Sequence, residues 1–159
     1  GGIGGIGGDA LMAYNYETKS YLAYARGVDF AKASEILDEC EIHVMIPQII
    51  NAAFACELLL KAVVIMEQKR EERFHEHKLS ELFNMMKPET QVTIKSKANI
   101  FDWDGFMQKS SNAFVEWRYS HEEDKVMFIS SSDLRRLYSA LKEYHEATYP
   151  LATIVEWKE

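Results

Sequence analysis

The chain has 159 residues, of which 47% are hydrophobic and 27% are charged, and its formal net charge is −7 at pH 7. A chain of this length and composition can remove about 70% of its unfolded surface from water, which predicts a single core. The acidic balance excludes a broad basic surface that coats nucleic acid, but not a small arginine cluster that contacts one RNA phosphate.

The opening GGIGGIGG lacks a basic region and a continuous apolar run, so it is not typical of a secretory signal. No strand precedes it, so we do not expect a dinucleotide fingerprint there. We predict a flexible Gly-rich tail or tag remnant over residues 1–9 and one helical domain over residues 10–159. The two cysteines, Cys40 and Cys56, show no CxxC spacing, which favours a reducing, cytoplasmic setting. We expect no cofactor and no bound metal.

The first predicted helix runs from about Glu17 to Asp38. Apolar side chains recur in it at intervals of three or four residues, and the expected buried face carries Tyr21, Tyr24, Val28 and Ala31. The pattern is moderate because Gly27 lies in the middle of the segment.

The second predicted helix runs from about His43 to Gln68, and its only Asp, Glu, Lys or Arg residues before Glu67 are Glu57 and Lys61. A helix that is apolar on nearly every side must be surrounded by other helices. Pro47 fits its first turn, where a missing amide donor costs little. The segment is also long enough to cross a bilayer, but the two charged side chains would be costly in lipid, so we expect a core helix and no membrane contact.

The segment EQKREER, residues 67–73, is interpreted as a solvated charged run that ends that helix or forms the turn after it. HKLSELFNMM then predicts a short amphipathic helix that ends near Pro88 and buries Leu79, Leu82, Phe83 and Met86. The pattern of residues 88–99 leaves a short helix, a connector or a strand open.

The next helix is predicted from about Trp103 to Glu123. Its aromatic-rich face contains Trp103, Phe106, Ser110, Ala113, Phe114, Trp117 and His121. The last helix begins at SSSDL, where a serine can cap the first turn and Asp133 meets the positive end of the helix dipole. Its expected buried stripe is Leu134, Leu137, Tyr138, Leu141 and His145.

Three groups of residues could carry chemistry. Glu57 and Lys61 have the spacing of an ion pair along one helical face, and the same pair could instead line a cleft. Arg118, His121 and Glu122 project from adjacent turns of one side, where an arginine could hold a phosphate while a histidine moves protons. The local alternative is an Arg118–Glu122 ion pair beside an ordinary histidine.

The third group is HEHK, with His75 and His77. Two histidines two residues apart do not share a helical face, and metal binding would need a further ligand. We therefore expect His77 to cap or pack the start of the short helix.

The segments NAAFACELLLKAVVI, HKLSELFNMM and NAFVEWRYSHEED occur in this order within residues 51–124. Together they resemble the pattern of the HEPN domains, the higher eukaryotes and prokaryotes nucleotide-binding family. The resemblance implies an all-α, up-and-down bundle of about five helices that forms a homodimer in bacterial toxin–antitoxin, phage-defence or RNA-processing systems. It also implies an antitoxin or nucleotidyltransferase partner.

Catalytic HEPN members resemble metal-independent RNases with an arginine followed by a polar residue and a later histidine. Arg118 matches that arginine, and His121 follows it sooner than in those members. A divergent branch with Arg-Tyr-x-x-Glu matches at Arg118, Tyr119 and Glu122. The ligand-binding residues that we expect are Glu57, Lys61, His77, Arg118, Tyr119 and Glu122.

The leading hypothesis is a HEPN-like domain that binds RNA, a nucleotide or a partner protein in a groove beside Arg118. The first alternative is an endoribonuclease in which Arg118 steadies the scissile phosphate and His121 acts as acid or base. The second alternative is a structural protein–protein interaction module.

Overall fold

The computed structural model describes residues 15–41, 45–111 and 129–150. In these ranges the chain is all-α, as expected, and contains no strand. The described part already holds six helices, more than the expected total of about five, because residues 88–98 form a helix of their own. The helices are α2 (Tyr16–Glu39), α3 (Met45–Gln68), α4 (Leu79–Asn84), α5 (Pro88–Ala98), α6 (Trp103–Ser111) and α8 (Ser131–Thr148).

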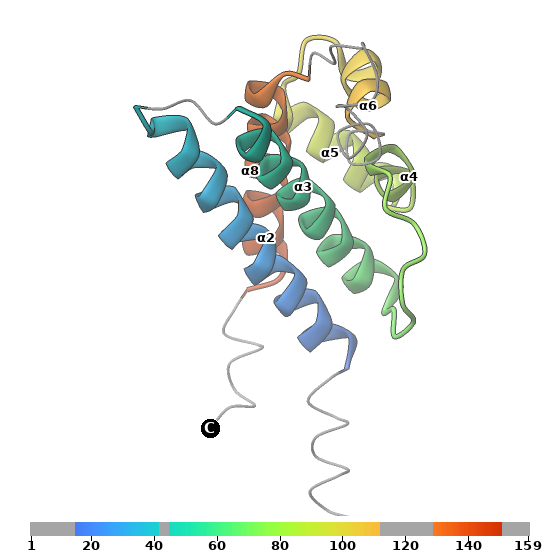
Figure 1. Cartoon of the computed structure of the whole chain (residues 1–159). Helices are drawn as coiled ribbons and strands as arrows, with labels where there is room; N and C mark the ends of the chain where they lie inside the picture. The colour runs from blue at the N-terminus through green and yellow to red at the C-terminus, as the bar shows by residue number, and fades with distance from the viewer. Residues whose placement is uncertain (1–14, 42–44, 112–128, 151–159) are drawn as a thin grey trace, which may run out of the picture.

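Three long helices form the body of the bundle (Figure 1). Helices α2 and α3 run antiparallel as a hairpin, and α8 packs along both of them. The short helices α4, α5 and α6 cover the side of the bundle away from α2. The expected Gly-rich tail, the His43 start of the second helix and the part of the fourth helix beyond Ser111 lie outside the described residues.

The buried face of α2 differs from the predicted one. Of the four predicted positions only Ala31 is buried, while the two tyrosines and Val28 are partly exposed. The buried side chains are small, because this face of α2 lies close against α3: Thr18, Ser20, Gly27, Ala31 and Ser34. Two of them also donate hydrogen bonds to α3 carbonyls, from Ser20 Oγ to Ala62 O at 2.7 Å and from Ser34 Oγ to Gln48 O at 2.9 Å.

Gly27 lies where α2 packs tightly against α3. A Cβ atom at this position would lie 2.8 Å from Cγ of Leu59, whose side chain is fully buried. We expect Gly27→Ala to lower the free energy of unfolding by about 1–2 kcal/mol, because the overpacking cost outweighs a helix-propensity gain of about 1 kcal/mol. Urea unfolding of wild type and variant measures the difference. In a Leu59→Ala background the same change should be neutral or stabilising, and a loss of equal size there would contradict the steric explanation.

Helix α3 is the apolar centre of the fold. It contacts α2, α4 and α8, and its middle is buried from Ala52 to Ile65 on most sides. Among the described helices it is also the one whose length and hydropathy would suit a membrane span, and 67% of its most apolar window is buried inside the protein. The apolar surface of α3 is thus largely covered by neighbouring helices.

The predicted faces of the later helices are confirmed wherever they are described. All four apolar positions predicted for α4 and its C-terminal end are buried, as is the whole predicted stripe of α8, from Leu134 to His145. Ser130 caps α8, since its Oγ accepts a hydrogen bond from the Asp133 amide at 3.2 Å. On α6, Trp103, Phe106 and Ser110 are buried as predicted.

Candidate functional site

Glu57, Lys61 and His77 meet at the exposed edge of α3. Nζ of Lys61 lies 3.4 Å from Oε2 of Glu57 and 3.0 Å from Nδ1 of His77, and His77 Nδ1 lies 3.5 Å from Oε1 of Glu57. The side chains of Glu57 and Lys61 are only 10% and 13% exposed, whereas His77 is 65% exposed. The predicted ion pair is therefore present and largely buried, and a histidine from the next segment contacts both of its members.

Of the two roles expected for His77, capping of α4 is wrong, because the N-cap residue is Lys78 and no side chain bonds the helix from that position. Oε1 of Glu76 accepts hydrogen bonds from the amides of His77 and Lys78, which precede α4, and the first-turn amide of Ser80 donates to Ser111 Oγ at 2.9 Å. The hydrogen bond from the Lys78 amide is the main cause that lowers the pKa of Glu76. The His77 ring is left to face α3, and its neutral form can accept a hydrogen bond from Lys61 through Nδ1.

The charged run after α3 folds back along the end of that helix. Lys69 adopts a left-handed conformation with φ of 50°, and the Arg70 amide donates to the Ile65 carbonyl at 3.0 Å, which is a Schellman-type helix end. The Arg70 guanidinium then donates to the carbonyls of Glu72 and Arg73 and to the Gln68 side chain. Three hydrogen bonds from one arginine fix the shape of this turn.

Glu71 ties the same turn to the beginning of α2. Its Oε1 accepts from the Tyr16 amide at 3.0 Å, so it occupies the positive end of the α2 dipole. Lys19 donates to the Glu71 carbonyl at 2.6 Å and lies 3.4 Å from its carboxylate. The turn is thereby held at both ends, by α3 and by α2, and the first residues of α2 lie beside the last residues of α3 (Figure 1).

A cleft of about 400 Å³ lies between the turn and the two helices, and we call it the Lys61 cleft. Phe74 forms one apolar wall, with Arg70 Cζ 4.4 Å and Lys61 Nζ 5.5 Å from its ring centroid. A cleft of this size falls in the range of small-molecule sites. Its lining residues are Lys19, Lys61, Ile65, Arg70, Glu71, Glu72, Arg73 and Phe74.

The lining of the Lys61 cleft departs from the charge of the chain as a whole. Four cationic side chains face two carboxylates there, whereas the chain carries a net charge of −7. Cationic and aromatic side chains around a concave surface favour an anionic ligand with a flat or apolar part. Residues 69–73 do form a turn after α3, one of the two expected alternatives, but the sequence analysis did not predict a cleft there. The aromatic Phe74 directly after the charged run could have indicated one.

Ser20 and His145 form a second polar contact, inside the core. Oγ of Ser20 lies 3.1 Å from Nε2 of His145, and both residues are almost fully buried. The single Ser20 hydroxyl proton is donated to the Ala62 carbonyl, so the histidine must donate through Nε2–H. A nucleophilic serine requires the opposite arrangement, with the histidine accepting its proton. This pair therefore joins α2, α3 and α8 and does not form a hydrolytic dyad.

The surroundings of His145 keep its ring neutral. Burial lowers the pKa of His145 to about 4, against a smaller opposing effect of Glu146. Tyr24 stacks on the ring with centroids 4.7 Å apart, and Tyr149 meets it edge-on at 5.1 Å. Tyr24 also donates to the Glu146 carboxylate, and burial together with this bond raises the pKa of Tyr24.

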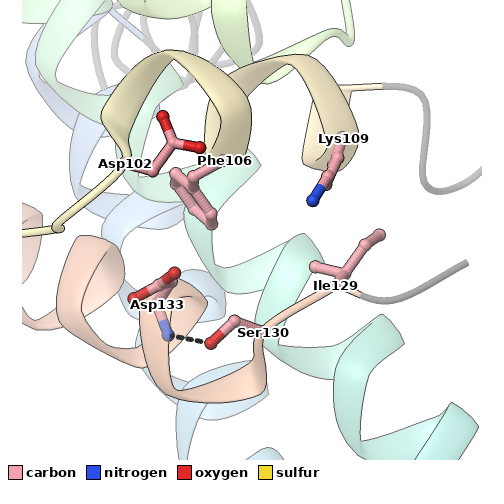
Figure 2. A pocket seen from close by; sticks show the side chains of 6 residues that line it. All are labelled: Asp102, Phe106, Lys109, Ile129, Ser130 and Asp133. Atoms are coloured by element: carbon pink, nitrogen blue, oxygen red, sulfur yellow. Dashed lines mark hydrogen bonds between the residues drawn. The ribbon is translucent and has the colours of Figure 1, made fainter.

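A smaller cavity of about 120 Å³ lies between α6 and the start of α8 (Figure 2). Asp102, Phe106 and Lys109 line it from the α6 side, and Ile129, Ser130 and Asp133 line it from the other. Asp102 caps α6 through a hydrogen bond from the Gly105 amide at 3.1 Å. The volume of this cavity is well below that of a typical ligand site, and we assign no ligand to the cavity.

Four of the predicted site residues lie outside the described part of the chain: Arg118, Tyr119, His121 and Glu122. The structure gives no geometry for the proposed phosphate and proton-transfer roles of these residues. In the described ranges no group of three or more His, Cys, Asp or Glu side chains is arranged to hold a metal ion. His75 and His77 thus have no third ligand among those residues.

Searches against protein-family models, curated proteins and solved structures find no match for this chain.

Proposed function

We propose that this chain is a HEPN-like helical domain that binds RNA or a nucleotide at the Lys61 cleft, in a bacterial defence, toxin–antitoxin or RNA-processing system. One observation carries the proposal. Glu57 and Lys61 from the first segment that resembles the HEPN pattern meet His77 from the second, at 3.0–3.5 Å, beside a cleft with a cationic lining.

The position of the ion pair adds support. Between Met45 and Met66 this strongly apolar helix carries one carboxylate and one ammonium group, and the two lie one turn apart in contact with each other. Lys61 also lines the cleft, where one of its three N–H donors is left after Glu57 and His77. A purely structural pair would not require the cationic turn that lies beside it.

Binding of fluorescent single-stranded RNA and of free nucleotides to the purified full-length chain tests this function. We expect saturable binding that weakens as salt rises, since cations in the cleft contact phosphate. The same samples, incubated with total RNA in EDTA, report on cleavage, with Arg118→Ala as the comparison. Absence of binding to every RNA and nucleotide tested would contradict the proposal.

A further inference from the structure

The cations of the Lys61 cleft approach it from three elements. Lys19 comes from α2, Lys61 from α3, and Arg70 and Arg73 from the turn between α3 and α4. The turn is held in place by the hydrogen bonds of Arg70 and Glu71 described above. A ligand would therefore meet a preformed arrangement of donors, with little loop ordering to offset.

These cationic side chains differ in how many N–H donors are not already used in hydrogen bonds within the protein. Arg70 is engaged by the turn itself, whereas the exposed Arg73 makes no side-chain hydrogen bond or ion pair with any other described residue. Lys19 donates twice to Glu71 and retains one N–H. The free donor capacity is thus concentrated at Arg73, with single donors from the two lysines.

The carboxylates of Glu71 and Glu72 limit what can occupy the cleft. Both line it, and Glu72 is exposed beside Arg73. An extended RNA strand that crossed this surface would bring successive phosphates past both carboxylates. A single terminal phosphate would reach the lysines and Arg73 without the electrostatic repulsion that successive phosphates would meet at the two carboxylates. It also carries a charge of about −1.5 to −2 at pH 7, more than the single charge of an internal diester.

We infer that the Lys61 cleft recognises a terminal phosphate group, the phosphomonoester dianion, with Phe74 and Ile65 providing an apolar wall for the adjoining part of the ligand. This inference rests on the proposed function and narrows its ligand. The group can be carried by a free mononucleotide or by the 5′ end of an RNA strand, and both present the same chemistry to the cleft.

Calorimetric titration of the full-length chain with four probes tests the inference: AMP, adenosine, a 5′-phosphorylated RNA pentamer and the same pentamer with a 5′-hydroxyl. We expect each phosphorylated probe to bind at least about 10-fold more tightly than its unphosphorylated counterpart, as for hydrogen bonds to a charged group. Preference for AMP over the phosphorylated pentamer would assign the free nucleotide as the source, and the reverse preference would assign the RNA end.

Two variants connect the binding to the cleft. Arg73→Ala should weaken AMP binding about 10-fold, whereas Arg26→Ala, which removes an exposed arginine of α2 that does not line the cleft, should leave it unchanged. Glu72→Gln removes a repelling charge and should strengthen AMP binding about 3-fold, a gain that a merely structural role of the turn would not produce. Circular dichroism of each variant confirms that it is folded.

Equal affinity for the 5′-phosphorylated and 5′-hydroxyl pentamers would overturn the inference and leave the proposed function standing. RNA binding that is unchanged in Arg73→Ala would do the same. If none of the four probes binds and longer RNA does not bind either, the proposed function fails together with the inference.

Discussion

Replacing Lys61 by alanine is expected to lower the free energy of unfolding by about 3–5 kcal/mol, the range for breaking a buried ion pair by removing one partner. The Glu57 carboxylate is only 10% exposed in the wild type, and the variant would leave it, among the described residues, beside the exposed His77 ring at 3.5 Å. A largely buried carboxylate that has lost its ammonium partner is costly to keep in the fold.

Urea unfolding at pH 7 measures this loss, and the chain offers a matched control. Lys142 and Glu146 on α8 have the same spacing and lie 3.0 Å apart, but their side chains are 42% and 46% exposed. Lys142→Ala should cost less than about 1 kcal/mol. The double variant Glu57→Gln with Lys61→Met, which removes both charges, should recover most of the stability. A Lys61→Ala loss no larger than that of Lys142→Ala would contradict a buried pair.

The stability of the fold is expected to fall by about 2 kcal/mol between pH 7 and pH 5 through His145 alone. The pKa of His145 is lowered to about 4 by burial, whereas an unfolded histidine titrates near 6.5. Below that unfolded value the unfolded chain binds a proton that the folded chain does not. The stabilisation is therefore complete above about pH 6.5 and is lost as the pH falls toward 4.

Comparison with His145→Gln isolates this effect, since glutamine can still donate to Ser20 but cannot take up a proton. Urea unfolding at both pH values should show wild type losing about 2 kcal/mol more than the variant between pH 7 and pH 5. The carboxylates titrate in both proteins and cancel in the difference. His145→Phe, which keeps an aromatic ring beside Tyr24, serves as a second non-titrating variant. Equal losses in wild type and both variants would show that His145 is accessible to protons in the fold.

The elements with strong periodicity could be predicted from the sequence. Helix α3 was evident from the near absence of charge between Glu41 and Glu67, and the stripe of α8 was predicted residue by residue. The pattern of α5 does not decide between helix and strand, because Val92, Thr93 and Ile94 are equally compatible with a strand. Capping by Glu67 at its first turn, through the Lys87 amide and the Thr90 hydroxyl, belongs to tertiary structure and is not visible in local pattern.

The buried face of α2 could not be predicted either, because it is set by tertiary packing against α3 and not by local pattern. Hydrophobic periodicity points to large apolar side chains, whereas the close approach of α2 and α3 selects small ones at Ser20, Gly27 and Ser34. The contact of Ser20 with His145 joins positions 125 residues apart, and nothing in the spacing of either residue indicates it.

The candidate site was predicted in part. The Glu57–Lys61 pair follows from helical spacing, and His77 was included among the expected ligand-binding residues, although its contact with Lys61 depends on how the chain returns after α3. The Arg70–Phe74 side of the cleft depends on the left-handed conformation of Lys69. A lysine does not indicate that conformation in the sequence, whereas a glycine would. The assignment of Arg118, Tyr119, His121 and Glu122 remains a prediction.

A titration of isotope-labelled protein with AMP, followed through its backbone amide NMR signals, tests the role of the Lys61 cleft most directly. We predict saturable shifts at Lys19, at Lys61 and over residues 70–74, with little change at Asp102 and Asp133 around the smaller cavity. Saturable shifts confined to positions outside the Lys61 cleft, or no shifts at millimolar AMP, would contradict the assignment of this cleft as the binding site.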